Sequence, residues 1–431
     1  MKIKIGTATL NGMAEGISSK SDAHRLLIAA SLADGETKLH LRGTSADILA
    51  TQNCLMALGA QISYKEDTMT ILPVDKKKVK TIPLLDCKES GSTLRFLLPV
   101  AAVLGGGAQV VGSGRLPERP IDTLVELLKS HGCKVEGEKL PLSMAGKLTG
   151  GSFSLPGNIS SQYITGLLFA LPLAEKDSEI ILTTPLESKS YVEMTMRTLE
   201  KFGITLEVLM DEGKKEIMGW NIPGRQSYHT PGEVTVEGDW SNAAFWLAAG
   251  AAGDGIVGCS GLETASSQGD RHILQILENM GGYYGVNPDG IAFWRTTLQG
   301  VTLDVSQVPD LLPILAVVAA KAPGKTTFFN GKRLRLKECD RLSAMTDCLR
   351  RLGVQVEERE DGLVVHGGTR QEINGPVEVS SYGDHRIVMA MSIAAAVLHQ
   401  EIIIDGAEAV EKSYPTFFDM FRQLGGEANV L

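Results

Sequence analysis

One supersecondary unit recurs along the chain: an amphipathic helix that ends at a glycine and is followed by two short strands. The six helices of this kind end at Gly59, Gly132, Gly203, Gly281, Gly353 and Gly425. Successive glycines in this series are 73, 71, 78, 72 and 72 residues apart. Because glycine readily adopts the left-handed conformation that ends many helices, we predict that each one directly follows a helix cap. A spacing this regular predicts six copies of one unit.

A second helix is predicted upstream of each glycine-terminated helix, and it has a different character. These second helices start near residues 21, 91, 160, 239, 308 and 384. Each begins with small or polar residues and is then apolar on nearly all sides, as in SDAHRLLIAASLADG from residue 21. That pattern is typical of a buried helix, whereas the amphipathic helices should lie at the surface. Each unit therefore combines one buried helix, one surface helix and several strands.

The length of the chain favours two domains, because 431 residues exceed what one hydrophobic core usually supports. The longest step between glycines, 78 residues, separates the third unit from the fourth. We therefore predict an α/β protein with two domains of three units each, in which the buried helices form the core and sheets surround them.

The charge balance limits the kinds of partner. The chain has 42 Lys and Arg residues against 51 Asp and Glu residues, a formal net charge of −9, which argues against binding to nucleic acid or to an anionic membrane. The six cysteines show no CxxC spacing and the N-terminus lacks a signal-peptide core, so we expect a soluble cytoplasmic protein with reduced thiols. An anionic ligand must then bind in a local cationic pocket. The stretch KRLRLKECDR (332–341) concentrates five cations in this acidic chain.

The starts of the buried helices are candidate anion sites, because free backbone N–H groups and the positive end of the helix dipole attract anions. Several cations lie beside these starts or in neighbouring loops: Lys20, Arg25, Arg95, Arg119, Arg386 and Lys412. Taken singly, each is better explained as a solvated or structural cation. Their recurrence beside apolar helix starts favours binding, and arginine suits the planar geometry of a carboxylate or phosphate.

The acidic residues near these positions leave two interpretations open. Asp239, Asp310 and Asp384 could cap helices, and Glu338 could only pair with its cationic neighbours. Alternatively, a carboxyl group held in a cationic pocket could transfer protons. The sequence has no metal-ligand spacing of histidines, no P-loop, no GxSxG elbow and no catalytic cysteine motif. We therefore expect phosphate chemistry that uses no metal and no cofactor.

Short motifs in order along the whole chain point to one enzyme family. They are SKSDAHR (19–25), ESGSTLR (89–95), LPERPI (116–121), SSQYITGLL (160–168), SKSY (188–191), EGDWSNAAF (237–245), SSQGD (266–270), VPD (308–310), RLKECDR (335–341), YGDHR (382–386) and EKSYP (411–415). This series resembles the 5-enolpyruvylshikimate-3-phosphate synthase family.

The resemblance implies a fold and an activity. The fold is a two-domain inside-out α/β barrel in which each domain has three βαβαββ repeats with buried helices. We expect one domain at 1–19 plus 238–431 and the other at 20–237, with the active site in the cleft between them. The implied reaction transfers the enolpyruvyl group of phosphoenolpyruvate to the 5-hydroxyl of shikimate 3-phosphate through a tetrahedral intermediate. A monomer that glyphosate inhibits is expected.

The resemblance also implies roles for individual residues. Phosphoenolpyruvate would be bound by Lys20, Arg119, Arg341, Arg386 and Lys412, with Gly91 and Gln162 beside it. The shikimate carboxylate would be held by Ser21 and Arg25. The phosphate of shikimate 3-phosphate would be held by Ser160, Ser161, Ser188 and Lys337, with Tyr191 nearby. Asp310 would accept the proton of the 5-hydroxyl, Glu338 would protonate the methylene carbon, and Lys20 would take part in the coupled proton transfers.

This chain departs from a well-known branch of the family at a few positions. Ser92 replaces Thr and Phe96 replaces Pro in ESGSTLRF, and Arg333 stands where that branch has an Asn that contacts the phosphate. Gly91 is retained, so we expect the space beside phosphoenolpyruvate to stay open.

Two alternatives remain open on the sequence. UDP-N-acetylglucosamine enolpyruvyl transferase shares the fold and the donor, but it uses a loop cysteine that GSGRLPERP lacks, and it lacks the SKSxxxR start. A non-catalytic anion-binding module on the same repeats is the other alternative, although such a module should have lost Asp310 or Glu338.

Overall fold

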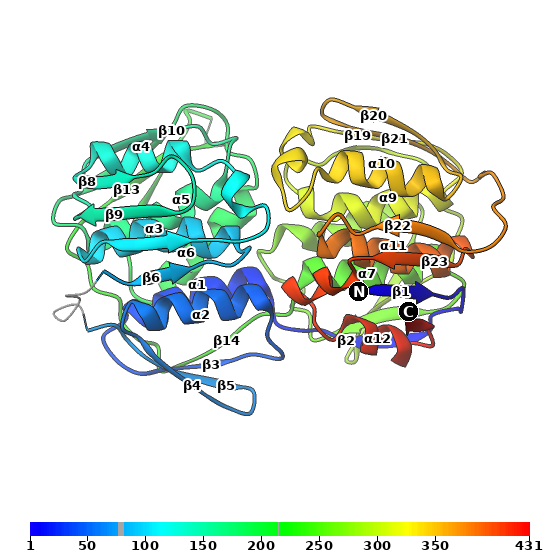
Figure 1. Ribbon diagram of the computed structural model, residues 1–431, viewed down its shortest axis with the longest axis horizontal. Helices are drawn as coiled ribbons and strands as arrows, with labels where there is room; N and C mark the ends of the chain where they lie inside the picture. Colours follow the sequence, from blue (N-terminus) through cyan, green and yellow to red (C-terminus); the bar gives the residue numbers. More distant parts are fainter. Residues whose placement is uncertain (76–81, 214) are drawn as a thin grey trace. The chain divides into compact units, whose positions relative to one another are not determined.

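The computed structural model describes residues 1–75, 82–213 and 215–431, and these divide into two compact units. The first unit comprises Met1–Ser19 and Glu237–Leu431, and the second comprises Lys20–Val236. Each unit has its own hydrophobic core. Because the chain passes from the first unit to the second and back, the first unit is discontinuous in sequence (Figure 1).

Within the described residues, the second unit contains three four-stranded sheets. The first sheet has the order β14 (Glu233–Thr235), β3 (Thr37–His40), β5 (Thr68–Leu72), β4 (Gln61–Lys65). The second has the order β6 (Leu84–Asp86), β7 (Ala108–Val111), β9 (Leu142–Gly146), β8 (Cys133–Glu136). The third has the order β10 (Ser152–Leu155), β11 (Ser178–Leu182), β13 (Ile217–Ile222), β12 (Glu207–Met210).

The first unit repeats this arrangement in the part of the chain that the structure describes. Its first sheet has the order β2 (Gly12–Glu15), β15 (Val257–Ser260), β17 (Gly290–Trp294), β16 (Tyr283–Asn287). Its second has the order β18 (Thr302–Asp304), β19 (Gly324–Phe329), β21 (Gly362–Gly367), β20 (Gln355–Arg359). Its third has the order β22 (Val377–Ser380), β23 (Ile402–Asp405), β1 (Lys2–Ile5), β24 (Ala428–Val430).

Every sheet pairs its strands in the same way. The first two strands in the orders above are parallel, and the other neighbours are antiparallel. A parallel pair needs a long crossover connection, and a helix supplies it in each sheet that is continuous in sequence. The predicted βαβαββ repeats, three in each unit, are confirmed.

The helices predicted to be buried form the interior of each unit. They are α1 (Lys20–Leu32), α3 (Gly91–Leu104) and α5 (Ser161–Ala170) in the second unit and α7 (Trp240–Ala252), α9 (Leu312–Lys321) and α11 (His385–Leu398) in the first. All 14 residues of α11 are buried. In the first unit α7, α9 and α11 contact one another in pairs (Figure 1). Sheets surround these helices, as the sequence predicts.

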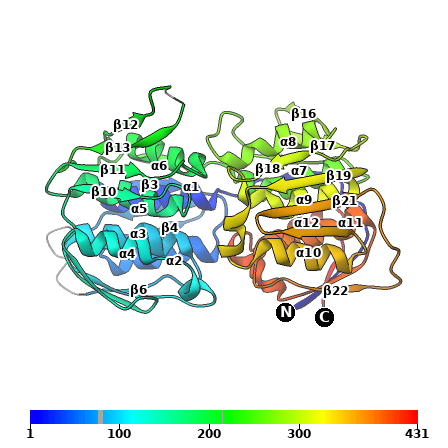
Figure 2. The same cartoon turned by 90° about the horizontal axis from the view of Figure 1, so that it is seen from above.

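Close approach of α3 and α5 in the second unit depends on a glycine. The two helices run side by side in both views (Figures 1 and 2). A Cβ atom on Gly166 would lie 2.2 Å from the carbonyl oxygen of Arg95, so only glycine permits this packing distance. The contact holds the N-terminal turns of both helices in a fixed relation.

The surface helices end as predicted. They are α2 (Ala46–Ala57), α4 (Asp122–Ser130), α6 (Lys189–Lys201), α8 (Ile273–Asn279), α10 (Arg341–Arg351) and α12 (Phe417–Gln423). Each is followed by one cap residue and then by one of the six glycines, whose φ angles lie between +75° and +109°. The left-handed conformation expected from the repeat is therefore confirmed at all six positions.

Some helix starts differ from the prediction. The helix α2 begins at Ala46, eight residues before the amphipathic stretch at 54, because the hydroxyl of Ser45 accepts a hydrogen bond from the N–H of Ile48 and caps it. The buried helix expected from 308 begins at Leu312, after the short 3-10 helix η4 (Pro309–Leu311). Pro313 favours this later start, because proline lacks an N–H and fits best in the first turn of a helix.

The remaining 3-10 helices are η1 (Leu116–Glu118), η2 (Leu171–Leu173), η3 (Gly269–His272), η5 (Lys332–Leu336) and η6 (Ala407–Lys412). All six cysteines are buried as free thiols. In the described parts of the chain, no helix combines the length and the apolar character needed to cross a membrane.

Candidate functional site

The predicted site residues lie mainly at the starts of helices. In the second unit, Lys20, Gly91 and Ser161 are the first residues of α1, α3 and α5, and Ser160 and Ser188 precede α5 and α6. In the first unit, Arg341 begins α10 and Arg386 is the second residue of α11. Free N–H groups at these starts and cationic side chains beside them can both bind anions.

Arg25 on α1 is fixed by contacts from three directions. Its Nη1 donates to the carbonyl of Ser21 at 2.5 Å, its Nη2 to the carbonyl of Tyr191 at 2.8 Å and its Nε to the hydroxyl of Thr195 at 2.9 Å. Its guanidinium also lies over the rings of Phe96 and Tyr191. Burial lowers the pKa of Arg25 to about 10, which still leaves the group charged at neutral pH. Ser21, Arg25 and Tyr191 are thus brought together.

Lys20, the first residue of α1, pairs with the first turn of α2. Its Nζ lies 2.9 Å from Oδ2 of Asp47, and both side chains are largely buried. The sequence reasoning did not identify Asp47 as a partner. A carboxylate at this distance keeps the lysine ammonium in one place and available to a second anion.

Gly91 lies against two arginines. A Cβ atom at this position would lie 2.5 Å from Nη1 of Arg95 and 2.9 Å from Nη1 of Arg119. The space expected to be open beside Gly91 is therefore occupied by the ends of these side chains. The guanidinium groups of Arg95 and Arg119 can take these positions because the residue at 91 has no side chain.

Gln162 on α5 connects to the same region. Its Oε1 accepts from Nη1 of Arg95 at 3.1 Å, and its Nε2 donates to the hydroxyl of Ser92 at 3.0 Å. The hydroxyl of Ser160 caps α5 by accepting from the N–H of Gln162 at 3.3 Å. Gly91, Arg119 and Gln162, which the resemblance assigns to one substrate, are thereby linked through Arg95.

Ser188 has an unusual backbone for its residue type. Its φ angle is +53°, in the left-handed region that non-glycine residues rarely adopt, and the residue is buried. Strained backbone of this kind persists only where its surroundings impose it, and it is common at ligand sites.

The first unit contains a group of opposed charges centred on Arg341. The group consists of Asp310, Lys337, Glu338, Arg341, Asp384 and Arg386, and we call it the Arg341 cluster. Arg341, which is only 1% exposed, donates to Asp310 at 2.6 Å, to Glu338 at 2.9 Å and to Asp384 at 2.7 Å. A buried arginine that reaches three carboxylates fixes all of them in one geometry.

Asp310 is the carboxylate that contacts the most cations of the cluster. Besides Arg341, it lies 3.2 Å from Nη2 of Arg386 and 3.6 Å from Nζ of Lys337. Burial would raise the pKa of Asp310, but the charges of Arg386, Lys337 and Arg341 outweigh burial and hold that pKa well below its usual range. Burial lowers the pKa of Lys337, and the charge of Asp310 opposes this. Asp310 is therefore ionised at neutral pH.

Asp384 has the structural role that the sequence left open for it, and it also pairs with a cation. It caps α11 by accepting from the N–H of Arg386 at 2.9 Å, and it also binds Arg341. Lys412, at the end of η6, donates to the carbonyl of the adjacent Gly383 at 2.7 Å. The residue pair Asp384 and Gly383 therefore connects Lys412 to the Arg341 cluster.

The other cations of KRLRLKECDR have structural partners. Lys332 pairs with Glu360 at the surface, Arg335 pairs with Asp340 and Glu358, and Arg333 donates to the carbonyl of Ser306. These contacts account for the three cations that the cluster does not use.

Asp270, in the SSQGD motif, is a buried residue of this region that sequence reasoning did not select. It is 2% exposed, and it accepts a hydrogen bond from the hydroxyl of Ser241 in the first turn of α7. Burial, together with the charge of Asp310, raises the pKa of Asp270 to about 6, although the charge of Arg386 opposes the shift. SSQGD is one of the motifs that resemble the family. The sequence signal that could have identified Asp270 is that it is the one acidic residue of this motif, among small and polar residues.

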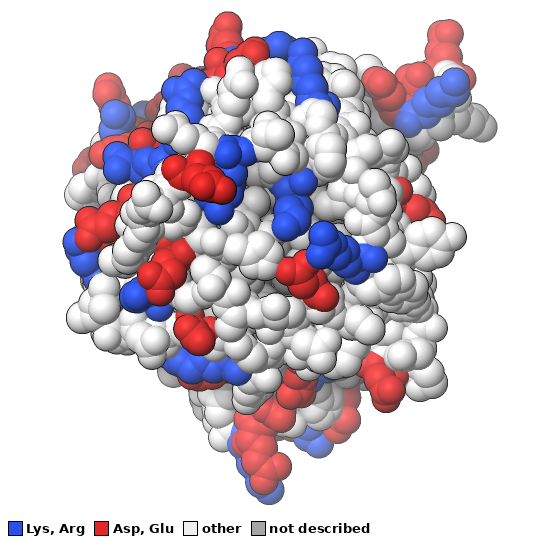
Figure 3. Space-filling model, turned by 90° about the vertical axis from the view of Figure 1, so that its right-hand side faces the viewer, with Lys and Arg blue, Asp and Glu red and all other residues white. Residues whose placement is uncertain are grey.

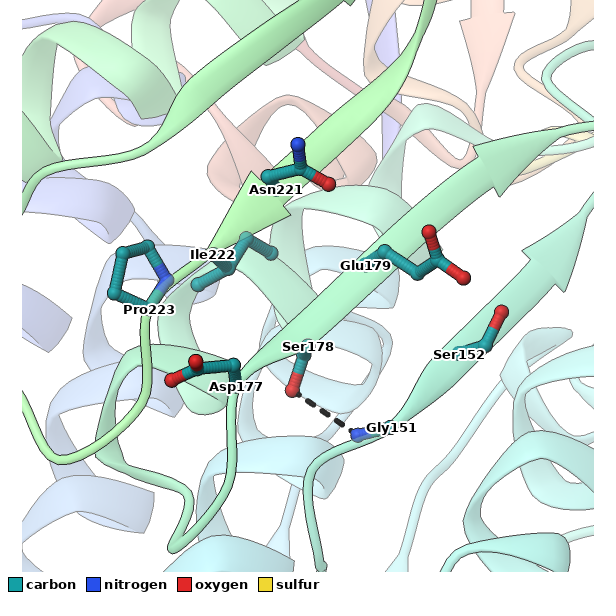
Figure 4. Close-up of a pocket in the computed structure, with 8 residues that line it drawn as sticks. All are labelled: Gly151, Ser152, Asp177, Ser178, Glu179, Asn221, Ile222 and Pro223. Atoms are coloured by element: carbon teal, nitrogen blue, oxygen red, sulfur yellow. Dashed lines mark hydrogen bonds between the residues drawn. The ribbon is translucent and has the colours of Figure 1, made fainter.

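Two other features of the surface do not belong to the site. A shallow depression on the second unit is lined by Gly151, Ser152, Asp177, Ser178, Glu179, Asn221, Ile222 and Pro223, none of them a predicted site residue (Figure 4). On the face drawn in Figure 3, basic and acidic side chains are interspersed. Such a face offers no single-sign field to a large polyanion.

Comparisons with known proteins agree on one family. A family model described as EPSP synthase (3-phosphoshikimate 1-carboxyvinyltransferase) matches residues 5–421. The chain is 42% identical over 428 residues to a protein named 3-phosphoshikimate 1-carboxyvinyltransferase from Clostridium perfringens, covering 99% of this chain and 98% of that protein. A protein of the same name from Clostridium kluyveri is 43% identical over 427 residues, covering 99% and 97%.

Solved structures show the same likeness. A structure described as EPSP synthase from Acinetobacter baumannii is similar with a TM-score of 0.79 and 25% identity, and the match covers 100% of both chains. The enolpyruvyl transferase NikO from Streptomyces tendae is similar with a TM-score of 0.75, covering 99% of this chain and 98% of that one. Its 16% identity supports a shared fold only.

Proposed function

The chain belongs to the EPSP synthase family, and we propose the residues with which it transfers the enolpyruvyl group of phosphoenolpyruvate to shikimate 3-phosphate in the shikimate pathway. The observation that carries the proposal is the Arg341 cluster. It gathers residues from η4, from the starts of α10 and α11 and from the segments just before them into one set of three cations and three carboxylates, of which Arg341, Asp384 and Arg386 are buried. A set of this kind can bind an anionic substrate and move protons beside it.

Phosphoenolpyruvate binds to Lys20, Arg119, Arg341, Arg386 and Lys412. Gly91 and Gln162 lie beside it, and the contact between Gly91 and Arg119 supports this assignment. Cations that bind the phosphate and the carboxylate in the ground state also stabilise the charge that develops in the tetrahedral intermediate.

Shikimate 3-phosphate binds through both of its anionic groups. Ser21 and Arg25 hold the carboxylate, and the three contacts that fix Arg25 support this role. The phosphate is held by Ser160, Ser161, Ser188 and Lys337, with Tyr191 nearby. We assign no phosphate contact to Arg333, whose Nη2 donates to the carbonyl of Ser306.

Asp310 accepts the proton of the attacking 5-hydroxyl. Before a substrate anion binds to the neighbouring Arg386 and Lys337, the low pKa of Asp310 makes it a weak base. When phosphoenolpyruvate binds Arg386 and the phosphate of shikimate 3-phosphate binds Lys337, part of the positive charge at Asp310 is neutralised. The pKa of Asp310 then rises and the carboxylate becomes a better base. Base strength is thereby coupled to the presence of substrate.

Glu338 donates a proton to the methylene carbon of phosphoenolpyruvate while the hydroxyl oxygen bonds to the adjacent carbon. Lys20 takes part in these coupled proton transfers. In the second step the methyl carbon of the adduct returns a proton to the Glu338 carboxylate, the carbon–oxygen bond to phosphate breaks and phosphate leaves. The hydrogen bond from Arg341 supports the role of Glu338 as proton donor, because it holds the Glu338 side chain in one orientation.

The test is phosphate release by the purified protein with phosphoenolpyruvate and either shikimate 3-phosphate or UDP-N-acetylglucosamine. We expect release only with shikimate 3-phosphate, and kcat about 10²- to 10⁴-fold lower in Glu338→Gln and Asp310→Asn. Glu360→Gln is the matched control, because the side chain of Glu360 is exposed and pairs with the surface residue Lys332, outside the Arg341 cluster. Release only with the nucleotide sugar, or full activity in both variants, contradicts the proposal.

We further propose that the protein acts in the cytoplasm as a monomer, on small-molecule substrates and without nucleic acid or membrane partners. Light scattering of the purified protein over a concentration series tests the oligomeric state. A mass of twice 46.2 kDa contradicts the monomer.

A further inference from the structure

Four buried side chains of the second unit form a continuous hydrogen-bonded chain from α1 through α2 to the start of α3. Nδ1 of His24 lies 2.7 Å from the hydroxyl of Thr51, and that hydroxyl lies 2.7 Å from the hydroxyl of Thr93. Thr93 in turn donates to the hydroxyl of Ser90 at 2.8 Å. All four residues are 0% exposed. We call these four residues the relay. Thr51 lies outside the family motifs, and none of the four residues has been given a role so far.

The direction of every bond in the relay follows from the number of protons. Each threonine hydroxyl carries one proton, and Thr93 gives its proton to Ser90. The hydroxyl of Thr93 must therefore accept from Thr51, and Thr51 must accept from His24. His24 must therefore carry a proton on Nδ1, and if the ring is neutral the lone pair is on Nε2.

The surroundings of His24 agree with this protonation state. Nε2 is buried and has no hydrogen-bond partner among the described residues. Burial, and after it the charges of Lys20 and Arg25, hold the pKa of His24 well below its usual range. The imidazole is thus neutral at physiological pH, and only one of its two tautomers can complete the relay.

Each part of the relay lies beside a proposed substrate contact. His24 is one helical turn after Lys20, and Thr51 is one turn after Asp47, the partner of Lys20. Ser90 caps α3 by accepting from the N–H of Thr93 at 3.2 Å, and it directly precedes Gly91. The relay therefore links the start of α1 to the turn that carries Gly91 and faces Arg119.

We propose that His24, Thr51 and Thr93 are positioning residues that hold the first turn of α3, and with it the Gly91–Arg119 contact, at a fixed place relative to Lys20. The inference rests on the proposed function, because it assigns Gly91 and Arg119 to phosphoenolpyruvate. Removing one hydroxyl breaks the relay and lets the first turn of α3 move. Phosphoenolpyruvate should then bind more weakly, whereas the Ser21 and Arg25 contacts to shikimate 3-phosphate should remain.

The tautomer is tested without measuring activity. Nitrogen-15 NMR of the histidine side chains, with His24→Asn used to assign the signal, should show a neutral ring protonated on Nδ1. In Thr51→Val the Nδ1 signal should shift, because its acceptor is lost. A ring protonated on Nε2, or a charged ring at neutral pH, overturns the proposal even if the enzyme is fully active.

Kinetics test the positioning role. We expect Thr51→Val and Thr93→Val to raise the KM for phosphoenolpyruvate roughly three- to tenfold, while the KM for shikimate 3-phosphate changes less than about twofold. Thr93→Ser, which keeps the hydroxyl, should restore the wild-type value. Thr198→Val is the matched control, because Thr198 is buried in the same unit but donates only within its own helix.

Two results would overturn the positioning role. One is an equal rise of both KM values in the Thr93→Val variant, and the other is the same selective rise in Thr198→Val. Failure of the proposed function would look different, since the wild-type protein would then release no phosphate with shikimate 3-phosphate whatever the tautomer of His24.

Discussion

At the scale of single residues, Arg341 shows how one side chain organises the candidate site of the first unit. Each of its three nitrogens donates a hydrogen bond to a different carboxylate: Nε to Asp384, Nη1 to Asp310 and Nη2 to Glu338. A buried charge is costly unless it is paired and hydrogen-bonded, and each carboxylate here meets that condition through the same guanidinium. Lysine could not replace this residue, because an ammonium group has no planar fork.

Gly91 allows a prediction at the residue scale. In Gly91→Ala the new methyl group would lie within 3 Å of the ends of Arg95 and Arg119, so both guanidinium groups must move. Because these atoms are the ends of flexible side chains, we expect the change to disturb the anion site more than the stability of the fold. We propose that glyphosate binds at the ends of these two arginines, and we expect its inhibition constant to rise more than the KM of phosphoenolpyruvate. Equal rises of both constants in steady-state assays would contradict this.

At the scale of elements, the six left-handed glycines define the repeat, and two of them form a matched pair. A Cβ atom on Gly59 would lie 3.7 Å from Cγ1 of Val74, which is an ordinary contact, whereas one on Gly132 would lie 2.7 Å from the carbonyl oxygen of Lys147. Their φ angles, +109° and +98°, are similar. The two glycines therefore differ mainly in the space around them.

This pair separates backbone strain from steric overlap. We expect Gly59→Ala to lower the free energy of unfolding by about 1–2 kcal/mol, the cost of a left-handed non-glycine residue. Gly132→Ala should cost more, because a backbone carbonyl cannot move aside as a flexible side chain can. Urea unfolding of both variants measures the difference, and equal losses would show that the backbone of 147 relaxes freely.

The elements also show what the sequence could predict and what it could not. The period of the glycines and the all-apolar helices predicted the six repeats and their buried helices, because both depend on local patterns. The start of α2 was missed because one hydroxyl, that of Ser45, extends the helix beyond its amphipathic part.

Sequence patterns could predict fewer of the contacts within the candidate site, because most of those contacts join residues that are far apart in the chain. The motifs identified Asp310, Glu338 and Arg341, and their roles remain a proposal. From the sequence, Asp384 could be either a helix cap or a catalytic acid. In the structure it caps α11 and accepts a hydrogen bond from Arg341. The relay from His24 to Thr93 joins residues 27 and 42 positions apart in successive steps, and no periodicity encodes such a contact.

At the scale of the whole molecule, the two units have separate cores and contain buried titratable groups with opposite effects on stability. Burial and the charge of Asp310 raise the pKa of Asp270, in the first unit, from 3.8 to about 6. Burial and the charges of Lys20 and Arg25 hold the pKa of His24, in the second unit, below its ordinary 6.5. Both pKa shifts change the stability of the protein at mildly acidic pH.

The signs of the two effects follow from proton linkage. Between pH 3.8 and about 6 the folded first unit binds the Asp270 proton more tightly than the unfolded chain does, so this contribution to stability is lost as the pH rises. The total is about 3 kcal/mol. Below pH 6.5 the unfolded chain protonates His24 while the folded second unit does not, so that contribution is lost as the pH falls.

We therefore expect Asp270→Asn and His24→Asn to change the pH dependence of stability in opposite directions. Calorimetry between about pH 4 and 7 should show that Asp270→Asn loses stability relative to wild type most strongly at the acidic end, where the wild-type carboxyl is protonated. Relative to wild type, His24→Asn should gain stability as the pH falls, because asparagine does not titrate. If both variants shifted the curve by a constant amount at every pH, neither group would have the perturbed pKa on which the argument depends.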